Sequence, residues 1–170
     1  MPTIRRLHTV SPDEIDKLAH VLVDCVEGGA SVSFMYPLSW PRALDFWQSA
    51  ADEVARAERA LLVAEDDAGI VGAVQLPLAQ PENQPHRADL AKMLVHRRAR
   101  HQGIGAALLA AAEQAARDHG KTLLVLDTAS AEAERLYARA GWQRCGVVPG
   151  YALLPQGGLC ATTFFYRDLN

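Results

Sequence analysis

The sequence lacks the features of membrane and secreted proteins. No stretch reaches the roughly 18 consecutive apolar residues that a membrane-spanning helix needs, and the first ten residues have no apolar centre of signal-peptide length. The three cysteines, Cys25, Cys145 and Cys160, include no CxxC pair, and an odd count without metal-ligand spacing predicts reduced thiols that serve as packing residues. We therefore expect a cytoplasmic protein that contacts no membrane.

An excess of positive charge is also missing. The 17 lysines and arginines and the 20 aspartates and glutamates give a net charge of −3, and the pI is about 6.0, so no global field attracts nucleic acid. His96 and His101 are five residues apart, which is wrong for one helical face, so no metal site is expected. With 170 residues, of which 49% are apolar, the chain is predicted to be a single domain over residues 1–170.

What the sequence does contain is an apolar run, a basic turn and an alanine-rich helix in direct succession. Residues 90–95 predict a buried strand, residues 97–102 a basic turn, and residues from 103 onward have apolar side chains near helical spacing. A helix N-terminus offers unpaired N–H groups and a partial positive charge. Gly103 and Gly105 carry no Cβ, so phosphate oxygens can approach their backbone. This succession predicts an anion-binding site.

Three known phosphate-binding patterns compete for this turn. A P-loop is excluded because no lysine and hydroxyl follow the glycines. A dinucleotide fingerprint fits in part, since Asp127 lies roughly 20 residues on, but Leu108 stands where the third glycine belongs. Arg100–Gly105 satisfies [RQ]xxGxG, and this resembles the acyl-CoA-binding motif of the GNAT acetyltransferase superfamily. In that family the backbone amides of the loop hold the pyrophosphate of coenzyme A. A turn that binds nothing is the remaining alternative.

The remaining patterns predict the order of the elements. Ser11 is expected to cap the first helix and Ser39 the second. The strand at 122–128 is expected to be buried on both faces. Strands are expected at 3–7, 59–65, 70–78, 86–95, 122–128, 143–148 and 159–167, and helices at 12–27, 41–58, 103–118 and 130–140, with a loop at 149–158. The order β-α-α-β-β-β-α-β-α-β-β is an α+β fold with a mixed sheet of about seven strands, as in the GNAT family.

Transfer of an acetyl group to an amine needs a neutral amine, an oxyanion donor and a proton for the leaving thiolate. Residues 131–142, AEAERLYARAGW, resemble the second GNAT signature, which implies that Tyr137 lies near the thioester sulfur as general acid. Asp127 could hold the substrate ammonium or take its proton, and Asp89 is the second carboxylate. The alternatives are a core aromatic for Tyr137, a helix cap for Asp127 and a hydrated edge charge for Asp89.

The resemblance implies further contacts. A backbone N–H near Leu94 would serve as oxyanion donor, and Val95 would pair with the pantetheine amide. The apolar loop 28–40 is predicted to form either a pocket wall or a hydrophobic staple beneath the second helix. The acceptor would meet Ser31, Phe34, Met35, Asp89 and Asp127. Acetyl-CoA would be held by Met93, Leu94, Val95, Arg100, His101, Gln102, Gly103, Ile104, Gly105, Ala106, Ser130 and Tyr137.

Four segments narrow the resemblance to the tabtoxin-resistance acetyltransferase branch, which acetylates the amino group of a small β-lactam amino-acid toxin. They are residues 28–35, 86–95, 126–128 and 149–159. The sequence thus predicts an acetyl-CoA-dependent N-acetyltransferase, monomeric or homodimeric, that acts on the primary amine of a small molecule or amino acid by direct attack in a ternary complex. The alternatives are a protein N-terminal or lysine acetyltransferase and a non-catalytic acyl-CoA-binding sensor.

Overall fold

The strands are divided between two four-stranded sheets in the computed structural model, which describes residues 2–170. The first sheet has the order β1-β2-β3-β5 and the second β4-β6-β8-β7. In chain order the elements are β1 (Thr3–Leu7), α1 (Pro12–Glu27), α2 (Trp40–Ala55), β2 (Arg59–Asp66), β3 (Gly69–Pro77), β4 (Arg87–Asp89), β5 (Ala91–Val95), the 3-10 helix η1 (Arg97–Ala99), α3 (Ile104–Asp118), β6 (Leu123–Thr128), α4 (Ala131–Arg139), β7 (Gln143–Leu153) and β8 (Leu159–Asp168). The predicted α+β fold is confirmed.

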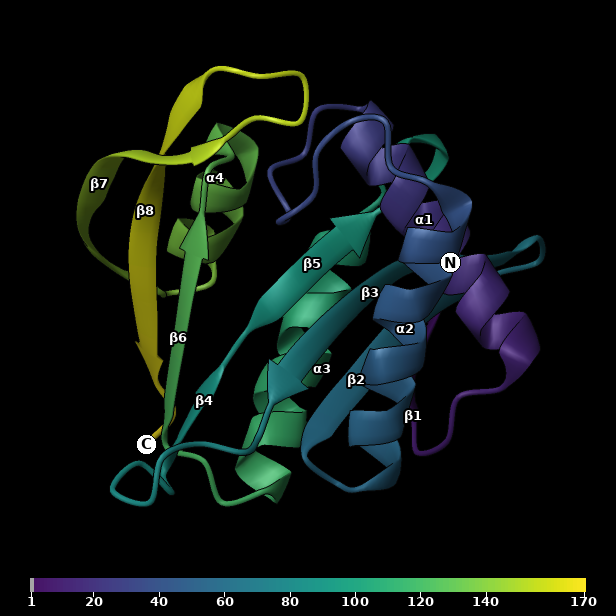
Figure 1. Ribbon diagram of the computed structural model, residues 1–170. Coiled ribbons are helices and arrows are strands. Elements are labelled where there is room, and N and C mark those ends of the chain that lie inside the picture. The colour runs from purple at the N-terminus through teal and green to yellow at the C-terminus, as the bar shows by residue number, and fades with distance from the viewer. Residues whose placement is uncertain (1) are drawn as a thin grey trace.

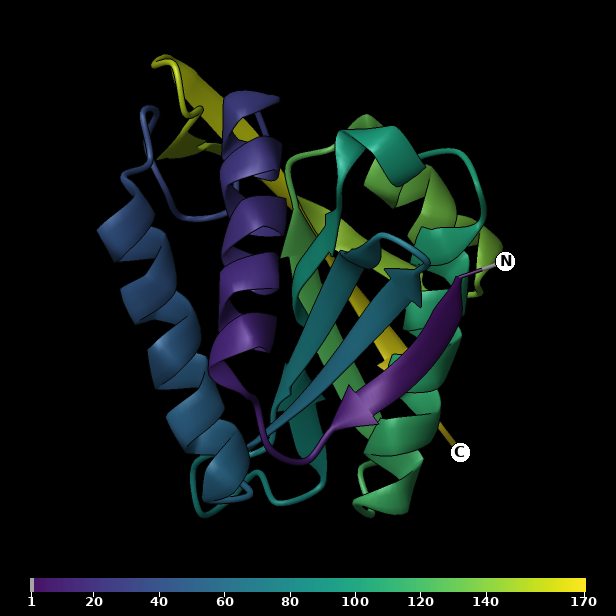
Figure 2. The ribbon, with the colours of Figure 1, turned by 90° about the vertical axis from the view of Figure 1, so that its right-hand side faces the viewer.

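Helices cover both faces of the first sheet (Figure 2). Because successive side chains of a strand point to opposite faces, Leu61 and Val63 of β2 pack with α1 and α2, whereas Leu62 packs with α3. Two apolar cores result, one on each side of this sheet. The core on the α3 side continues into the second sheet, where it contains Phe165 of β8.

The two sheets meet where one expected strand is broken in two. The sequence predicted a single strand over 86–95, but Leu90 separates β4, which pairs with β6 of the second sheet, from β5, which pairs with β3 of the first. The Leu90 amide still donates to the Val125 carbonyl at 2.9 Å, while Ala91 is already opposite Gln75. Beyond this point β5 and β6 diverge, as Figure 1 shows, and the edges between them stay unpaired.

Several local predictions can be compared with the structure. The capping box at Ser11 is confirmed, but Ser39 precedes α2 without a side-chain cap hydrogen bond. The predicted loop 149–158 is wrong in part, because β7 passes through Pro149 with an irregular register and remains paired to β8 as far as Leu153. β6 is not buried on both faces, since Asp127 is exposed.

Residues 2–170 were searched for membrane-spanning helices, metal-ligand clusters and disulfides. Within that range no helix is long and apolar enough to cross a membrane, and no group of three or more histidine, cysteine or acidic residues could hold a metal ion. All three cysteines are unpaired. Cys25 is buried as predicted, but the prediction of a packing role is wrong for Cys145, which is exposed on β7.

Candidate active site

A cavity of about 1240 Å³ occupies the opening between the two sheets. Its walls come from β5 on one side and β6 on the other, with the start of α3, the α4 helix and the loop after α1 completing them. Residues that lie far apart in the sequence therefore face one space, and both halves of the molecule contribute to it.

The start of α3 leaves backbone donors open to this cavity. Gly103 is the N-cap residue, it has a left-handed backbone with φ of 78°, and it supplies no side-chain cap. A Cβ placed on Gly103 would meet nothing within 4 Å. The first N–H groups of a helix have no intrahelical partner, so those of α3 are available to an anion in the cavity. Gly105 has a different role, because its Cβ would meet the Leu136 side chain of α4 at 3.2 Å.

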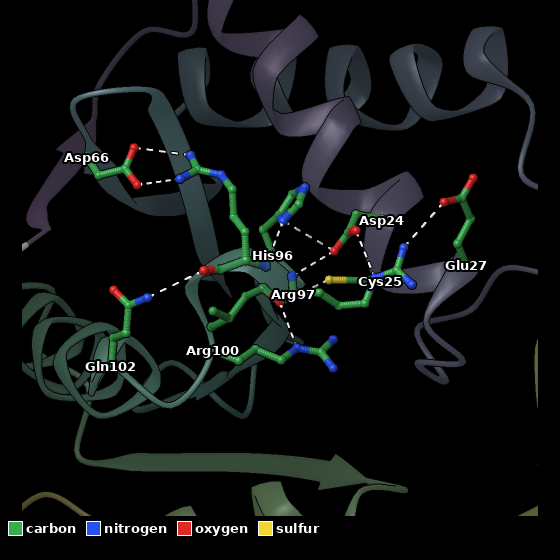
Figure 3. Close-up of polar contacts among 10 residues, drawn as sticks. Asp24, Cys25, Glu27, Asp66, His96, Arg97, Arg100 and Gln102 are labelled. Atoms are coloured by element: carbon green, nitrogen blue, oxygen red, sulfur yellow. Dashed lines mark hydrogen bonds and ion pairs between the residues drawn. The ribbon is translucent and has the colours of Figure 1, made fainter.

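Two of the three arginines in the basic turn are already paired with acidic side chains (Figure 3). Asp24 at the end of α1 accepts from both the backbone N–H and Nε of Arg97, at 2.8 and 2.9 Å. Asp66 accepts from both terminal nitrogens of Arg98, at 2.6 and 3.1 Å. Arg97 and Arg98 thus hold η1 against α1 and β2, and Arg100 is the arginine of this turn that lines the cavity.

The Val95 carbonyl already has protein partners. It accepts from Arg100 Nε at 3.2 Å and faces the Cys25 thiol at 3.5 Å (Figure 3). Burial raises the pKa of Cys25 and keeps it a neutral thiol. The expected pairing of Val95 with a pantetheine amide would therefore have to share this carbonyl or displace Arg100.

Asp127 ends β6 at the edge of the cavity. Its Oδ2 accepts from the Thr162 hydroxyl of β8 at 2.7 Å, and its side chain remains exposed to the cavity. It does not cap α4, because the N-cap is Ser130, whose Oγ accepts from the Ala133 amide at 3.2 Å. The helix-cap alternative for Asp127 is therefore excluded.

Tyr137 comes from α4 and reaches the same cavity. It is only 3% exposed and packs between Trp142 and Phe165, with ring centroids 5.7 and 5.9 Å away. Burial raises the pKa of Tyr137, and the negative charge of Asp127 raises it further. The phenol is therefore held in its protonated form, as a proton donor must be.

Asp89 is placed differently from Asp127. It lies on β4 opposite Val125, and it forms an ion pair with Arg87 on its own strand. Gln80 also lies 3.4 Å from its second oxygen. Asp89 lines the cavity, but its charge is already neutralised, which leaves Asp127 as the better placed carboxylate.

Lys92 lines the cavity as well and was missed in the sequence analysis. Its Nζ donates to the Ser33 hydroxyl at 2.9 Å and lies 6.0 Å from the centre of the Phe46 ring. Burial lowers the pKa of Lys92, the charge of Arg59 lowers it further, and Asp127 acts in the opposite direction. The available signal was a single lysine inside an apolar strand, AKMLV.

The cavity brings together most of the residues predicted for the site. Those that line it are Ser31, Asp89, Met93, Leu94, Val95, Arg100, His101, Gly103, Ile104, Gly105, Ala106, Asp127, Ser130 and Tyr137. Three others do not. Gln102 turns back to the Arg98 carbonyl at 3.4 Å, Phe34 packs edge-on against Phe46, and Met35 is 48% exposed. For Phe34 the hydrophobic staple on α2 is thus the better description.

The sequence and the structure of the chain both resemble those of known acetyltransferases. Residues 57–144 match the family model described as an acetyltransferase (GNAT) domain. An N-acetyltransferase from Staphylococcus aureus Mu50 has a similar structure, with a TM-score of 0.81, 17% identity, and coverage of 100% of this chain and 99% of that one. A ribosomal-protein-alanine N-acetyltransferase from Brucella melitensis has a TM-score of 0.80 and 22% identity, and the match covers 98% of this chain and 99% of that one. A phosphinothricin acetyltransferase from Sinorhizobium meliloti, solved in complex with acetyl-CoA, has a TM-score of 0.79 and 17% identity, and the match covers 99% of this chain and 89% of that one. At these identities the likeness shows a shared fold.

Proposed function

The chain belongs to the GNAT family of acetyltransferases, and from this membership we propose that it moves an acetyl group from acetyl-CoA to the primary amine of a small molecule. Acetyl-CoA as co-substrate follows from the family. The acceptor class is our proposal, and it rests on how one end of the cavity is closed.

The closure comes from the β7–β8 hairpin, which crosses to the loop after α1 (Figure 1). The Tyr36 amide donates to the Pro155 carbonyl at 2.9 Å, and Gln156 lies 3.4 Å from the Glu27 carbonyl. These contacts connect the turn between β7 and β8 of the second sheet to the end of α1 and the loop after it, which pack on the first sheet. A roofed cavity suits a small acceptor, whereas a protein chain would need an open groove. This is the observation that carries the proposal.

The residues at the start of α3 fit the phosphates of coenzyme A. Gly103 leaves the helix amides uncapped, the space beside it is open, and Arg100 adds a cation to the same wall. We propose that the amides of residues 103–106 hold the pyrophosphate, with His101 and Met93–Val95 along the rest of the ligand. Bound there, acetyl-CoA supplies the activated acetyl group as a thioester.

The proposed transfer assigns one task to each of two side chains. Asp127 holds the acceptor ammonium, and the amine attacks once its proton has passed to Asp127 or to water. The new bond joins the amine nitrogen to the acetyl carbon, and the bond from that carbon to sulfur breaks. Tyr137 gives its proton to the departing thiolate and regains one from solvent. A backbone N–H near Leu94 is the proposed oxyanion donor.

The assignment to one branch of the GNAT family is also part of this proposal. The likeness to a phosphinothricin acetyltransferase agrees with a small acceptor and loosely with the tabtoxin-resistance branch. The likeness to a ribosomal-protein-alanine N-acetyltransferase keeps protein N-termini as the second candidate. Whether the protein is a monomer or a homodimer stays a prediction.

The decisive experiment offers both acceptor classes to the same enzyme. The protein is incubated with acetyl-CoA and either a small-molecule amine library or a library of peptides with free N-termini and lysines. Products are identified by mass spectrometry as a gain of one acetyl group, and coenzyme A release is followed with a thiol reagent. We expect acetylated small amines. Acetylation confined to peptides would refute the small-molecule proposal, and tight acetyl-CoA binding without any product would indicate a sensor.

A further inference from the structure

Two strained residues meet on the wall of the cavity. Only four non-glycine residues within 2–170 have a positive φ, and Lys92 at 50° and Ser33 at 79° are two of them. Their side chains form a hydrogen bond of 2.9 Å, and both residues line the cavity. Backbone strain of this kind persists only where the surrounding structure enforces it, and it concentrates at ligand sites. The strained backbones and the hydrogen bond between the two side chains therefore occur together on the wall of the cavity.

The charge of Lys92 has no acidic partner. Within residues 2–170 no carboxylate lies in ion-pair distance of its Nζ, which contacts the Ser33 hydroxyl and lies over the Phe46 ring. The like charge that acts on Lys92 is that of Arg59, whose guanidinium is engaged by Glu53 and by Gln75. A half-buried cation costs free energy unless an anion compensates it, so an unpaired one beside a ligand cavity points to a charged ligand.

The position of Lys92 relative to Asp127 indicates which part of a ligand Lys92 would contact. Lys92 lies on β5 and Asp127 on β6, the two strands that diverge to form the opening. They do not form an ion pair, yet Asp127 is near enough to raise the pKa of Lys92. The acceptor end of the cavity thus presents one positive and one negative side chain from opposite walls.

We propose that Lys92 binds a carboxylate or another small anionic group of the acceptor, while Asp127 binds its amine. The acceptor would then be an amine that carries an anionic group, of which an amino acid is the simplest form. This inference rests on the proposed function and adds a specificity residue to it. The hydrogen bond to Ser33 orients the ammonium of Lys92, whose nitrogen lies over the Phe46 ring at 6.0 Å from its centre.

A structural role for Lys92 makes a different prediction. If it served only to connect loop 28–39 to β5, its loss would affect every acceptor equally. Charged hydrogen bonds within a site are worth more than neutral ones, and an uncharged ligand cannot form the same contact. The two roles therefore differ in the response to the charge of the acceptor.

The test compares amino acids with their carboxamides, in the wild type and in Lys92→Met. The substitution keeps an unbranched chain of similar length and removes the charge. We expect kcat/KM for the acids to fall roughly tenfold to a hundredfold, as for loss of a charge-assisted hydrogen bond, with little change for the amides. Lys92→Arg should recover part of the preference. Lys17→Met, on a partly exposed lysine of α1 that is paired with Asp13 and does not line the cavity, is the matched control and should resemble the wild type.

A binding measurement keeps this inference separate from the reaction. Calorimetry of acids and amides is carried out on protein saturated with coenzyme A, which allows no turnover. If acids bind more tightly than amides and Lys92→Met abolishes this preference, the inference is supported, whether or not any acceptor is acetylated. A lack of acetylation would refute the proposed function and not this inference. Equal losses for acids and amides, no preference for acids in the wild type, or no binding of either class would overturn it.

Discussion

The charge of Asp127 acts on the phenol of Tyr137, and both residues line the cavity. Tyr137 is almost completely buried, and both its burial and the charge of Asp127 raise its pKa. A carboxylate that stays ionised to hold an ammonium therefore helps to keep the phenol protonated. The two tasks that the reaction requires, an anion for the amine and an acid for the thiolate, are compatible in this arrangement.

Substitution of Tyr137 by phenylalanine tests the acid. The ring keeps its packing against Trp142 and Phe165, so stability and acetyl-CoA affinity should hardly change. Loss of general acid catalysis should lower kcat roughly 10²–10⁴-fold. In the wild type, the raised pKa means that kcat should not fall through ionisation of Tyr137 as the pH approaches about 10, where a free phenol would ionise.

The control for this experiment is the same substitution at Tyr151, which is 52% exposed on β7 and does not line the cavity. Both variants are assayed by thiol release against any acceptor that turns over. A Tyr137→Phe enzyme within about twofold of the wild type would leave Tyr137 as a core aromatic, and water would then be the acid.

Asp127→Asn separates charge from hydrogen bonding. The asparagine oxygen can still accept from the Thr162 hydroxyl, so the free energy of unfolding should be nearly unchanged. Without the negative charge, KM for the acceptor should rise roughly tenfold or more, while acetyl-CoA affinity stays close to wild type. Asp67→Asn, in the exposed β2–β3 turn, is the control. Lower stability with unchanged kinetics would show that Asp127 is structural.

Some residues of the site could be predicted from the sequence and others could not. Tyr137 and Gly103 stood in recognisable motifs, and both line the cavity. Lys92 and Ser33 could not be identified, because their contact depends on two strained backbones from segments 59 residues apart. Met35 appeared in an aromatic loop, but burial is decided by packing of the whole chain, and it is exposed.

At the scale of elements, η1 connects the end of α1 to the start of α3. Asp24 is the centre of this connection, because its side chain is only 13% exposed and accepts two hydrogen bonds from Arg97. Glu27 reaches the same arginine at 3.5 Å but is 50% exposed. The turn that carries Arg100 and Gly103 is thus held by a neighbouring helix.

The contrast between these two acids gives a prediction. Asp24→Ala should cost about 1.5–3 kcal/mol of unfolding free energy, since it leaves a charged donor and a backbone N–H without their acceptor. It should also weaken acetyl-CoA binding by loosening the turn. Glu27→Gln should cost less than about 1 kcal/mol, as is usual for exposed ion pairs. Urea denaturation and calorimetry measure both quantities, and equal effects of the two variants would contradict the special role of Asp24.

Gly103 shows the conformational demand at the start of α3. Its left-handed backbone predicts that Gly103→Ala costs about 1–2 kcal/mol, even though its Cβ would meet no atom within 4 Å. Gly103→Asn should cost less, because asparagine tolerates this conformation better. Gly146→Ala on β7 is the control, since that site is equally open and does not have a positive φ. Thermal or urea unfolding of the three variants checks this order, and an equal cost at Gly146 would contradict it.

Element types were largely predictable, whereas their breaks and extensions were not. Periodicity and caps identified α1 and α3, whose patterns are local to the sequence. The break at Leu90 is invisible locally, because no glycine or proline interrupts residues 86–95 and only the pairing partners of the two halves differ. β7 can continue past Pro149 because it is an edge strand, and its pairing with β8 resumes at Ala152 after an irregular register.

The whole molecule is two sheets connected at Leu90 and bridged again at the roof of the cavity. Between these points, the edges of β5 and β6 have no strand partner. The sequence indicated the α+β order but not this opening, which arises from long-range pairing. A ligand that fills the opening would contact both sheets at once, so binding should stabilise their relative position.

Hydrogen exchange can test this arrangement across the molecule. In the free protein, amides of β5 (91–95) and of the end of β6 (126–128) should exchange faster than those of β2, because β2 is paired on both edges whereas the edges of β5 and β6 towards the cavity are unpaired. Saturating acetyl-CoA should protect the first two segments and residues 103–106, and should change exchange in the β1–β2 pair far less. The Asp24→Ala variant, for which weaker acetyl-CoA binding is expected, provides the control for occupancy at the same ligand concentration. Uniform protection of all strands would indicate general stabilisation of the fold, and absence of protection at β5 would place the ligand outside the opening.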